Sequence, residues 1–245
     1  MPTTTARSSR APAVLAAAAV LLQVGYPLVH GQFRDRLTIL SVVALFAAST
    51  AHAFVSRGAA WTARFLLVCL GIGLLAEALG VATGIPFGSY RYGRSLGPSL
   101  LHVPVVVPLA WAMLGYPCLL VGQRLASGAR AVVVGACALA SWDLFLDPQL
   151  VAAGQWHWAH PGPGLNGIPL TNAVGWLVVA TVMMALLSRL PRVPADDRVP
   201  AALFLWTYGS SVLANLAFFG RPGVALVGGV GMGLVAVPYA RSLAR

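Results

Sequence analysis

Residues 61–82 read WTARFLLVCLGIGLLAEALGVA, and Arg64 and Glu77 are the only charged side chains in this stretch. A helix that crosses a bilayer needs about 20 consecutive, mostly apolar residues. The stretch lacks the period-two alternation of a barrel strand, and barrel strands carry far weaker apolar runs. It therefore predicts a membrane-spanning helix, and similar stretches recur along the whole chain.

Seven further apolar stretches are bounded mostly by Arg, Gly or Pro. The eight predicted spans are residues 13–30, 37–56, 61–82, 103–122, 130–147, 169–189, 200–219 and 223–240. Only 9% of the residues are charged, 58% are hydrophobic, and the mean hydropathy is +0.81. Because soluble domains carry about 25% charged residues, much of this surface must face lipid. We predict an all-α, polytopic transmembrane helix bundle of about eight spans.

The charges give the predicted topology. The chain has 16 arginines, no lysine and six acidic residues, for a formal net charge of +10. With eight spans, eleven arginines fall on one side of the membrane and five on the other. Positive residues concentrate on the cytoplasmic side, so both termini are predicted to be cytoplasmic in a multi-pass protein of the cell membrane. Residues 1–12 form a polar cytoplasmic N-terminus, and residues 13–245 form a single transmembrane helical domain.

Three carboxyl groups lie where a membrane protein normally avoids them. Glu77 is five residues from the end of its predicted span, while Asp143 and Asp147 lie near the end of another. An acid near the centre of a span costs about 2.5–3.5 kcal/mol on insertion, and intramembrane ionisable residues are functional candidates. The i, i+4 spacing places Asp143 and Asp147 on one helix face. Both spans run outward from the cytoplasm, so all three acids are predicted in one outer layer.

Two long connections, residues 83–102 and 148–168, lie on the arginine-poor side and are rich in Gly, Pro and aromatic residues. Irregular backbone at membrane depth is tolerated beside a polar cavity. Other polar side chains predicted in this layer are Gln23, Tyr26, His30, His102, Thr171, Asn172 and Asn215. We therefore expect one polar pocket beneath the two connections. A structural role, such as a helix cap at Asp147 or ion pairs with Arg91 or Arg94, is the alternative for the acids.

The sequence gives little support for a nucleic-acid-binding, metal or nucleotide site. The arginines are spaced singly between apolar stretches, which argues against a nucleic-acid-binding face. Five histidines and three cysteines lack the spacing of metal ligands, so no metal site is predicted. The glycine-rich residues 228–233 lie inside the last span without a preceding strand, which indicates close helix packing and no nucleotide site.

Three segments carry a family resemblance. They are GIPFGSYRYGRSLGPSLLHVPVVVPLAW (residues 84–111), WDLFLDPQLVA (142–152) and GIPLTNAVGW (167–176). Together they resemble the integral membrane carotenoid biosynthesis proteins of the CruF type. These are carotenoid 1,2-hydratases, and they include the hydratase of the bacterioruberin pathway. The resemblance is clearest from the third to the sixth span, about half of the chain.

The resemblance implies hydration of the terminal C1=C2 bond of an acyclic carotenoid end group. Protonation of C2 would leave a tertiary cation at C1, which captures water. The acid must keep its proton near neutral pH, and a carboxyl group removed from water favours its neutral form. We expect Asp143 or Glu77 to donate the proton and another of the three acids, Asp147 included, to orient water. A close Asp143–Asp147 pair would hold one proton between them.

Further residues are expected to bind substrate, cation or water: Tyr90, Arg91, Tyr92, Trp142, Thr171, Asn172 and Asn215. Each aromatic face would stabilise a cation by roughly 1–2 kcal/mol. The two asparagines are water-binding candidates, and the arginine tunes the acids or meets lipid headgroups. The polyene lies between helices in the bilayer, so the implied reaction requires no cofactor.

Two alternatives remain open from the sequence. A cyclase or isomerase would use the same acid and cation but trap the cation internally. A non-catalytic carotenoid transporter or partner protein would only pass carotenoids between enzymes. Transporters usually have broken helices near the bilayer midplane, whereas here the polar groups gather near one face. The expected partners are a lipophilic carotenoid, the lipid bilayer and other enzymes of the carotenoid pathway, without nucleic acid.

Overall fold

The computed structural model describes residues 10–160 and 164–245. Within these ranges eight helices are long and apolar enough to cross a membrane, which confirms the predicted helix bundle. They are α1 (Ala11–Gly25), α2 (Gln32–Arg57), α3 (Ala59–Thr83), α4 (Val106–Leu125), α5 (Gly128–Ala152), α6 (Leu170–Leu187), α7 (Arg198–Ala217) and α8 (Pro222–Leu243). The predicted N-terminal segment 1–12 lies mostly outside the described residues, and its separation from one helical domain stays a prediction.

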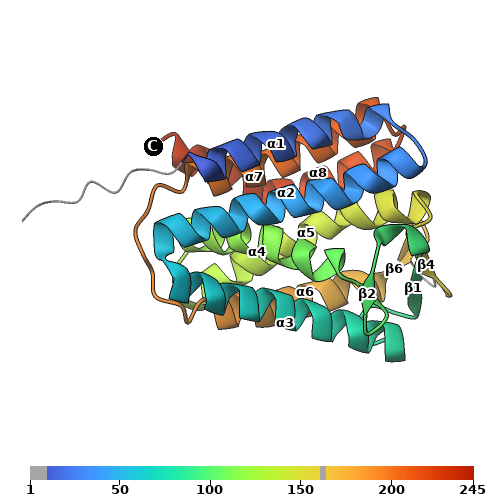
Figure 1. The fold of residues 1–245 in the computed structure, drawn as a ribbon, viewed down its shortest axis with the longest axis horizontal. Helices are drawn as coiled ribbons and strands as arrows, with labels where there is room; N and C mark the ends of the chain where they lie inside the picture. The colour runs from blue at the N-terminus through green and yellow to red at the C-terminus, as the bar shows by residue number, and fades with distance from the viewer. Residues whose placement is uncertain (1–9, 161–163) are drawn as a thin grey trace, which may run out of the picture.

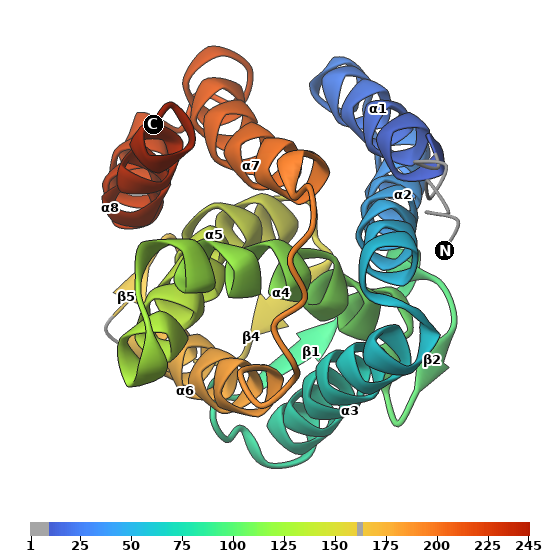
Figure 2. The same cartoon turned by 90° about the vertical axis from the view of Figure 1, so that its left-hand side faces the viewer.

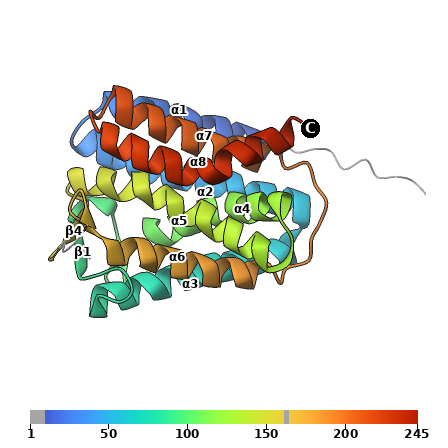
Figure 3. The same ribbon diagram turned by 180° about the vertical axis from the view of Figure 1, so that it is seen from behind.

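The helices run side by side along the long axis of the molecule (Figure 1). The short strands gather at one end, which we call the loop end, and the C-terminus lies at the opposite end (Figures 1 and 3). The described chain crosses the bundle eight times, which is an even number. Helix α1 therefore begins, and helix α8 ends, at that opposite end. The cytoplasmic location of this end stays a prediction.

The helix α4 lies at the centre of the bundle (Figure 2). Fifteen of its 20 residues are buried, whereas α1 buries only Pro12 and Ala19. Large apolar side chains cover the outside, where Leu21, Leu67 and Leu234 are 71%, 76% and 74% exposed. Apolar surface of this extent is rare on soluble monomers. It is the surface expected of a protein that faces lipid.

A small sheet joins the two long connections. Strand β1 (Tyr90–Tyr92) pairs antiparallel with β4 (Trp156–Trp158), with Tyr90 opposite Trp158. The other short elements are η1 (Tyr26–Leu28), η2 (Arg94–Leu96), β2 (Ser99–Leu100), β3 (Val103–Pro104), β5 (Gly164–Leu165) and β6 (Ile168–Pro169). The connections therefore form a packed cover over the loop end of the bundle.

Helix α5 differs from its predicted span. The span was predicted to end at Asp147, but the helix continues through Pro148 to Ala152. A proline inside a membrane helix removes one backbone hydrogen bond, yet neighbouring helices make this tolerable. The end of α5 is closed instead by Gln155, whose backbone N–H donates to the Leu150 carbonyl at 2.9 Å. Asp147 is therefore inside the helix, and the interpretation of this residue as a terminal cap is wrong.

A polar cluster ties the α6–α7 connection to the bundle at the opposite end. The buried Arg57 guanidinium lies 2.7 Å from the Asp197 carboxylate and also donates to the Tyr116 hydroxyl. The two ring nitrogens of His52 lie 2.8 Å from the Tyr116 hydroxyl and 2.9 Å from the Asp196 carbonyl. The cluster thus joins α2, α4 and the segment before α7.

Replacing Arg57 by Met is expected to lower the free energy of unfolding by about 1–3 kcal/mol, because a buried, charge-assisted bond is lost. Asp197 is 33% exposed, and solvent screening keeps the loss in this range. Thermal unfolding in detergent measures it. The matched control is Arg198→Met, whose ion pair with Asp196 is exposed on both sides. Equal midpoints for the two variants would contradict a stabilising role for the cluster.

Candidate functional site

Glu77 in α3 is buried and fully satisfied by hydrogen-bond donors. Its Oε2 accepts bonds from the Tyr92 hydroxyl at 2.5 Å and from the Tyr90 hydroxyl. Its Oε1 accepts a bond from the Trp111 indole N–H at 3.0 Å. The carboxyl group is only 3% exposed and lies roughly 9 Å, six residues, from the last residue of α3. Three aromatic donors thus hold both of its oxygens in place.

The local sequence explains this cluster. In a strand, alternate side chains point to opposite faces, so Tyr90 and Tyr92 of β1 both face the bundle while Arg91 between them is exposed. Gly80, nearly one turn after Glu77, leaves room for the incoming ring. A Cβ atom there would lie 2.9 Å from the Tyr90 hydroxyl.

The two phenols remain donors over a wide pH range. Burial raises the pKa of Tyr90 above its ordinary value, and the neighbouring Glu77 carboxyl raises it further. Burial, and then the neighbouring Glu77 carboxyl, also raise the pKa of Tyr92. Both hydroxyls therefore keep their protons at neutral and moderately alkaline pH.

Asp143 and Asp147 of α5 form a second buried cluster. The Asn172 side-chain amide in α6 donates to the Oδ2 atoms of both, at 2.8 Å and 2.5 Å. The two carboxyl groups are also within hydrogen-bonding reach of each other. Their Oδ1 atoms are buried and find no donor among the described residues. Two adjacent carboxylates removed from water are unfavourable when both are ionised, so the resting pair is expected to keep one proton, and this shared proton would supply the missing donor.

A layer of tryptophans links the two clusters. The Trp111 and Trp176 rings are stacked with centroids 4.0 Å apart, and Trp142 meets the edge of Trp176 at 6.1 Å. Trp111 is the donor to Glu77, while Trp142 directly precedes Asp143. The three acids therefore belong to one region but form two hydrogen-bonded clusters.

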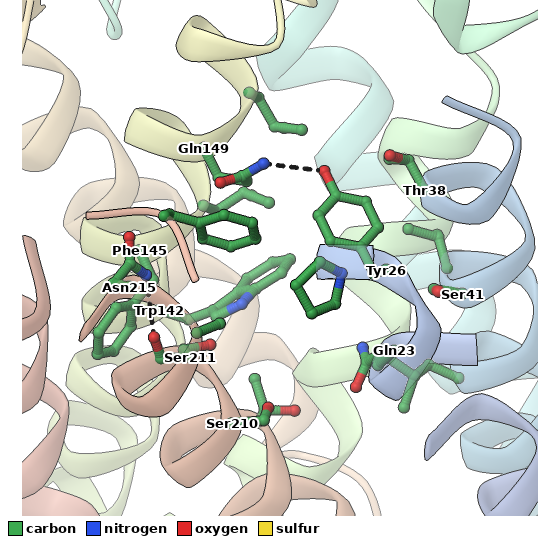
Figure 4. A pocket seen from close by; sticks show the side chains of 18 of the residues that line it. Gln23, Tyr26, Thr38, Ser41, Trp142, Phe145, Gln149, Ser210, Ser211 and Asn215 are labelled. Carbon is green, nitrogen blue, oxygen red and sulfur yellow. Dashed lines mark hydrogen bonds between the residues drawn. The ribbon is translucent and has the colours of Figure 1, made fainter. Parts of the chain in front are cut away.

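Two cavities adjoin the tryptophan layer. The larger, here called the central chamber, has a volume of about 170 Å³ between α1, α2, α5 and α7 (Figure 4). Its α7 wall carries a polar stripe at helical spacing, formed by Thr207, Ser210, Ser211 and Asn215. Its α5 wall is mainly apolar and includes Trp142, Phe145 and Leu146. The chamber thus combines a wall for water with a wall for hydrocarbon.

The smaller cavity, here called the tryptophan pocket, has a volume of about 40 Å³ and is lined by Trp111, Trp142, Trp156 and Trp176, together with Thr38 and aliphatic side chains. It shares Trp142, Leu146 and three other lining residues with the central chamber. None of the three acids lines either cavity in the described structure. Asp143 and Asp147 nevertheless each directly follow a residue that lines both.

The remaining predicted site residues lie in different places. Arg91 and Thr171 are exposed, and neither side chain makes a hydrogen bond or ion pair with an acid in the described part of the chain. Asn215 is buried in the wall of the central chamber, where its amide donates to the Ser211 carbonyl at 2.9 Å. The Asn215 Oδ1 atom has no donor in the described structure. The structure thus brings the predicted residues together in two groups. One is Glu77 with Tyr90 and Tyr92, and the other is Asp143 and Asp147 with Asn172.

The comparisons agree with this arrangement of a polar site in a membrane bundle. Residues 36–237 match the sequence profile of the family described as "Carotenoid biosynthesis protein". The chain belongs to this family. The match covers most of the chain and includes every acid and aromatic residue of the two clusters and the tryptophan layer.

One relative in the carotenoid biosynthesis family is named bisanhydrobacterioruberin hydratase, from Haloarcula japonica. It is 36% identical over 116 residues, which are 45% of this chain but only 39% of the relative. The chain thus matches well under two thirds of that protein. No solved structure matches the chain.

Trp111 and Trp176 were missed as site residues in the sequence. Each is the last residue of a segment that carries the family resemblance. A tryptophan inside an apolar span usually indicates core packing, so the residue type gave no signal. The available signal was its position, since Trp176 follows the candidate Asn172 by one helical turn.

Gly80→Ala is expected to destabilise the protein by about 1–3 kcal/mol, because the new methyl group overlaps the Tyr90 hydroxyl and the Phe87 ring. Thermal unfolding and pigment conversion in parallel test this. Gly71→Ala is the matched control, since it lies on the same helix and a Cβ atom there meets nothing within 4 Å. A G80A variant as stable and active as G71A would show that this close approach is unimportant.

Proposed function

We propose that this member of the carotenoid biosynthesis family is a membrane-embedded carotenoid hydratase, which adds water to the terminal C1=C2 bond of an acyclic end group. The family match and the hydratase relative support the class of reaction. The observation that carries the proposal is the buried Asp143–Asp147 pair, bridged by one asparagine and holding acceptor atoms without a donor. Such a pair is suited to keep and deliver one proton.

The aspartate pair, rather than Glu77, is proposed as the acid. Both Glu77 oxygens are occupied by three donors, whereas each aspartate accepts one bond from Asn172 and has a second oxygen to spare. A general acid must release its proton to the substrate and recover one afterwards. The fixed Glu77 carboxyl is proposed to stabilise the developing positive charge across the tryptophan layer.

The proposed reaction begins in the tryptophan pocket. A proton from the Asp143–Asp147 pair forms a bond to C2, and the electron pair of the double bond leaves a tertiary cation at C1. The Trp142, Trp111 and Trp176 rings that line this pocket are proposed to stabilise the cation, since an aromatic ring attracts positive charge. A modest movement of Trp142 would bring the acid into contact with the pocket.

Water is proposed to come from the adjoining central chamber. The Asn215 and Ser41 side chains line this chamber, and their oxygen atoms lack donors in the described structure. A buried water typically makes about three hydrogen bonds to such groups. The water attacks C1, and its excess proton returns to the ionised aspartate pair. The net change is one water molecule added, and no cofactor or metal takes part in these proposed steps.

The remaining predictions become part of this proposal. Tyr90 and Tyr92 position Glu77 and lie outside the reacting cavity, whereas Arg91 and Thr171 meet lipid headgroups at the exposed loop end. The proposed setting is the cell membrane, with both termini in the cytoplasm, and other carotenoid-pathway enzymes are proposed as partners. The lipophilic carotenoid reaches the site from the bilayer, so no nucleic acid or soluble carrier takes part.

Expression of the chain in a host that accumulates lycopene tests the proposed function. Mass spectrometry of the extracted pigments is expected to show the substrate mass plus one water molecule, with a tertiary hydroxyl group at the chain end. An unchanged mass with a ring end group would support a cyclase, and unchanged pigment would favour a transporter or partner protein. Either result would overturn the hydratase proposal.

A further inference from the structure

The first helix is the least buried of the eight described spans. Only Pro12 and Ala19 of α1 are buried, and the helix packs mainly against α2 at one edge of the molecule, with α7 also beside it (Figure 2). A hydrogen bond from the Trp206 indole N–H to the Gln23 amide oxygen, 2.6 Å long, bridges α1 and α7. Elements with few buried apolar contacts open at the lowest free-energy cost.

A crevice opens between these two helices toward the membrane. It has a volume of about 350 Å³ and is lined mainly by apolar side chains, among them Val24, Pro27, Leu213 and Phe218. We call it the lateral crevice. Leu213 and Phe218 are 59% and 52% exposed on the surface that faces lipid. Hydrocarbon from the bilayer can therefore reach this crevice without crossing a polar surface.

The lateral crevice adjoins the central chamber. It shares Gln23, Pro27, Ser210 and Ala214 with the central chamber. The chamber in turn shares Trp142 and four other lining residues with the tryptophan pocket. Shared lining residues thus place the crevice, the chamber and the tryptophan pocket next to one another, in a row from the lipid to the Trp142 ring that precedes Asp143.

The loop end offers a poorer route for an apolar substrate. Trp156 of β4 is buried against the Tyr92 ring, with centroids 5.8 Å apart, and Phe87 is almost completely buried beneath the same cover. A chain arriving there would have to displace these packed rings. It would also have to leave the lipid first, at about 25 cal/mol for each Å² of apolar surface exposed to water.

We propose that the gap between α1 and α7 is a lateral portal, through which a carotenoid end group enters from the bilayer. The inference rests on the proposed function and adds the route and orientation of the substrate. The polyene lies along the apolar α5 wall of the chamber and leaves between α1 and α7 into the lipid. Water occupies the opposite polar stripe of α7, between the portal and the reacting bond.

A removable plug tests the portal. Ser210→Cys places a thiol where the lateral crevice meets the chamber, and benzyl methanethiosulfonate attaches a ring that a reductant removes. Conversion of lycopene in isolated membranes is compared before modification, after modification and after reduction, so each variant is its own reference. We expect modification to reduce the initial rate by about tenfold, equivalent to ~1.4 kcal/mol, and reduction to restore it.

The matched control is Leu216→Cys, an exposed position of the same helix that lines neither the crevice nor the chamber. Its rate, and that of the wild type with native Cys137, should not change on treatment. If Ser210→Cys is inactive before modification, Ala214→Cys carries the same test. Full activity of the modified protein would overturn the portal, whereas a wild type without hydrated product would instead overturn the proposed function.

Discussion

Asp143→Asn is expected to lose at least ~100-fold of its hydration activity, the typical contribution of a positioned general acid, while inserting and folding normally. The asparagine keeps the shape of the side chain, and its oxygen can still accept the 2.8 Å bond from Asn172. It cannot share an ionisable proton with Asp147. Initial rates of lycopene hydration in membranes, normalised to the amount of folded protein, measure the effect.

The double variant Asp143→Asn/Asp147→Asn sharpens this prediction. Residues that act as one unit show strongly non-additive effects, so the double variant should be about as inactive as the more damaging single variant. Asp196→Asn is the control, because this carboxylate lies 70% exposed in the α6–α7 connection. Losses that multiply in the double variant would contradict a shared proton.

Much of the fold follows from the sequence because the bilayer fixes the length of each helix. The eight spans and their approximate bounds are set by runs of apolar residues about one membrane thickness long. The inward direction of Tyr90 and Tyr92, with Arg91 facing out, was not predicted, because it depends on strand β1, which forms only by pairing with the distant β4. The predicted span ended too early, at Asp147, because a proline usually ends a helix in a soluble protein. Inside a membrane bundle the neighbouring helices make the proline tolerable, so α5 continues through Pro148.

Which site residues contact one another was harder to predict from the sequence. Depth in the membrane follows from the position along a span, which placed Glu77, Asp143 and Asn215 in one layer. The direction around each helix does not follow, because helices that are apolar on every side carry no clear polar face. Asn215 therefore lies in the central chamber while Glu77 lies among tyrosines. Contacts such as the Trp111–Trp176 stack depend on how α4 and α6 pack.

The assignment of Glu77 as a fixed carboxyl, rather than the acid, leads to a second test. Glu77→Gln should reduce hydration by about 10²-fold or more, the usual loss when a group that stabilises transition-state charge is removed. The fold should survive, since the amide oxygen can accept from Trp111 and the amide nitrogen can donate to the Tyr90 and Tyr92 hydroxyls. Rates and thermal midpoints together separate the charge of Glu77 from its structural role.

Tyr92→Phe is the matched variant, because it removes one donor and leaves the Glu77 carboxyl in place. Because Tyr92 only positions Glu77, the loss of its hydroxyl should reduce the rate only a few-fold, in line with the ~1 kcal/mol of a typical hydrogen bond. The pKa of this phenol is raised, so its loss should leave the pH profile unchanged below the alkaline range. If Glu77→Gln and Asp143→Asn both keep the wild-type rate, neither the charge of Glu77 nor a proton shared by Asp143 and Asp147 is catalytic. If only Glu77→Gln keeps it, the carboxyl serves the aromatic cluster alone and the aspartate pair remains the acid.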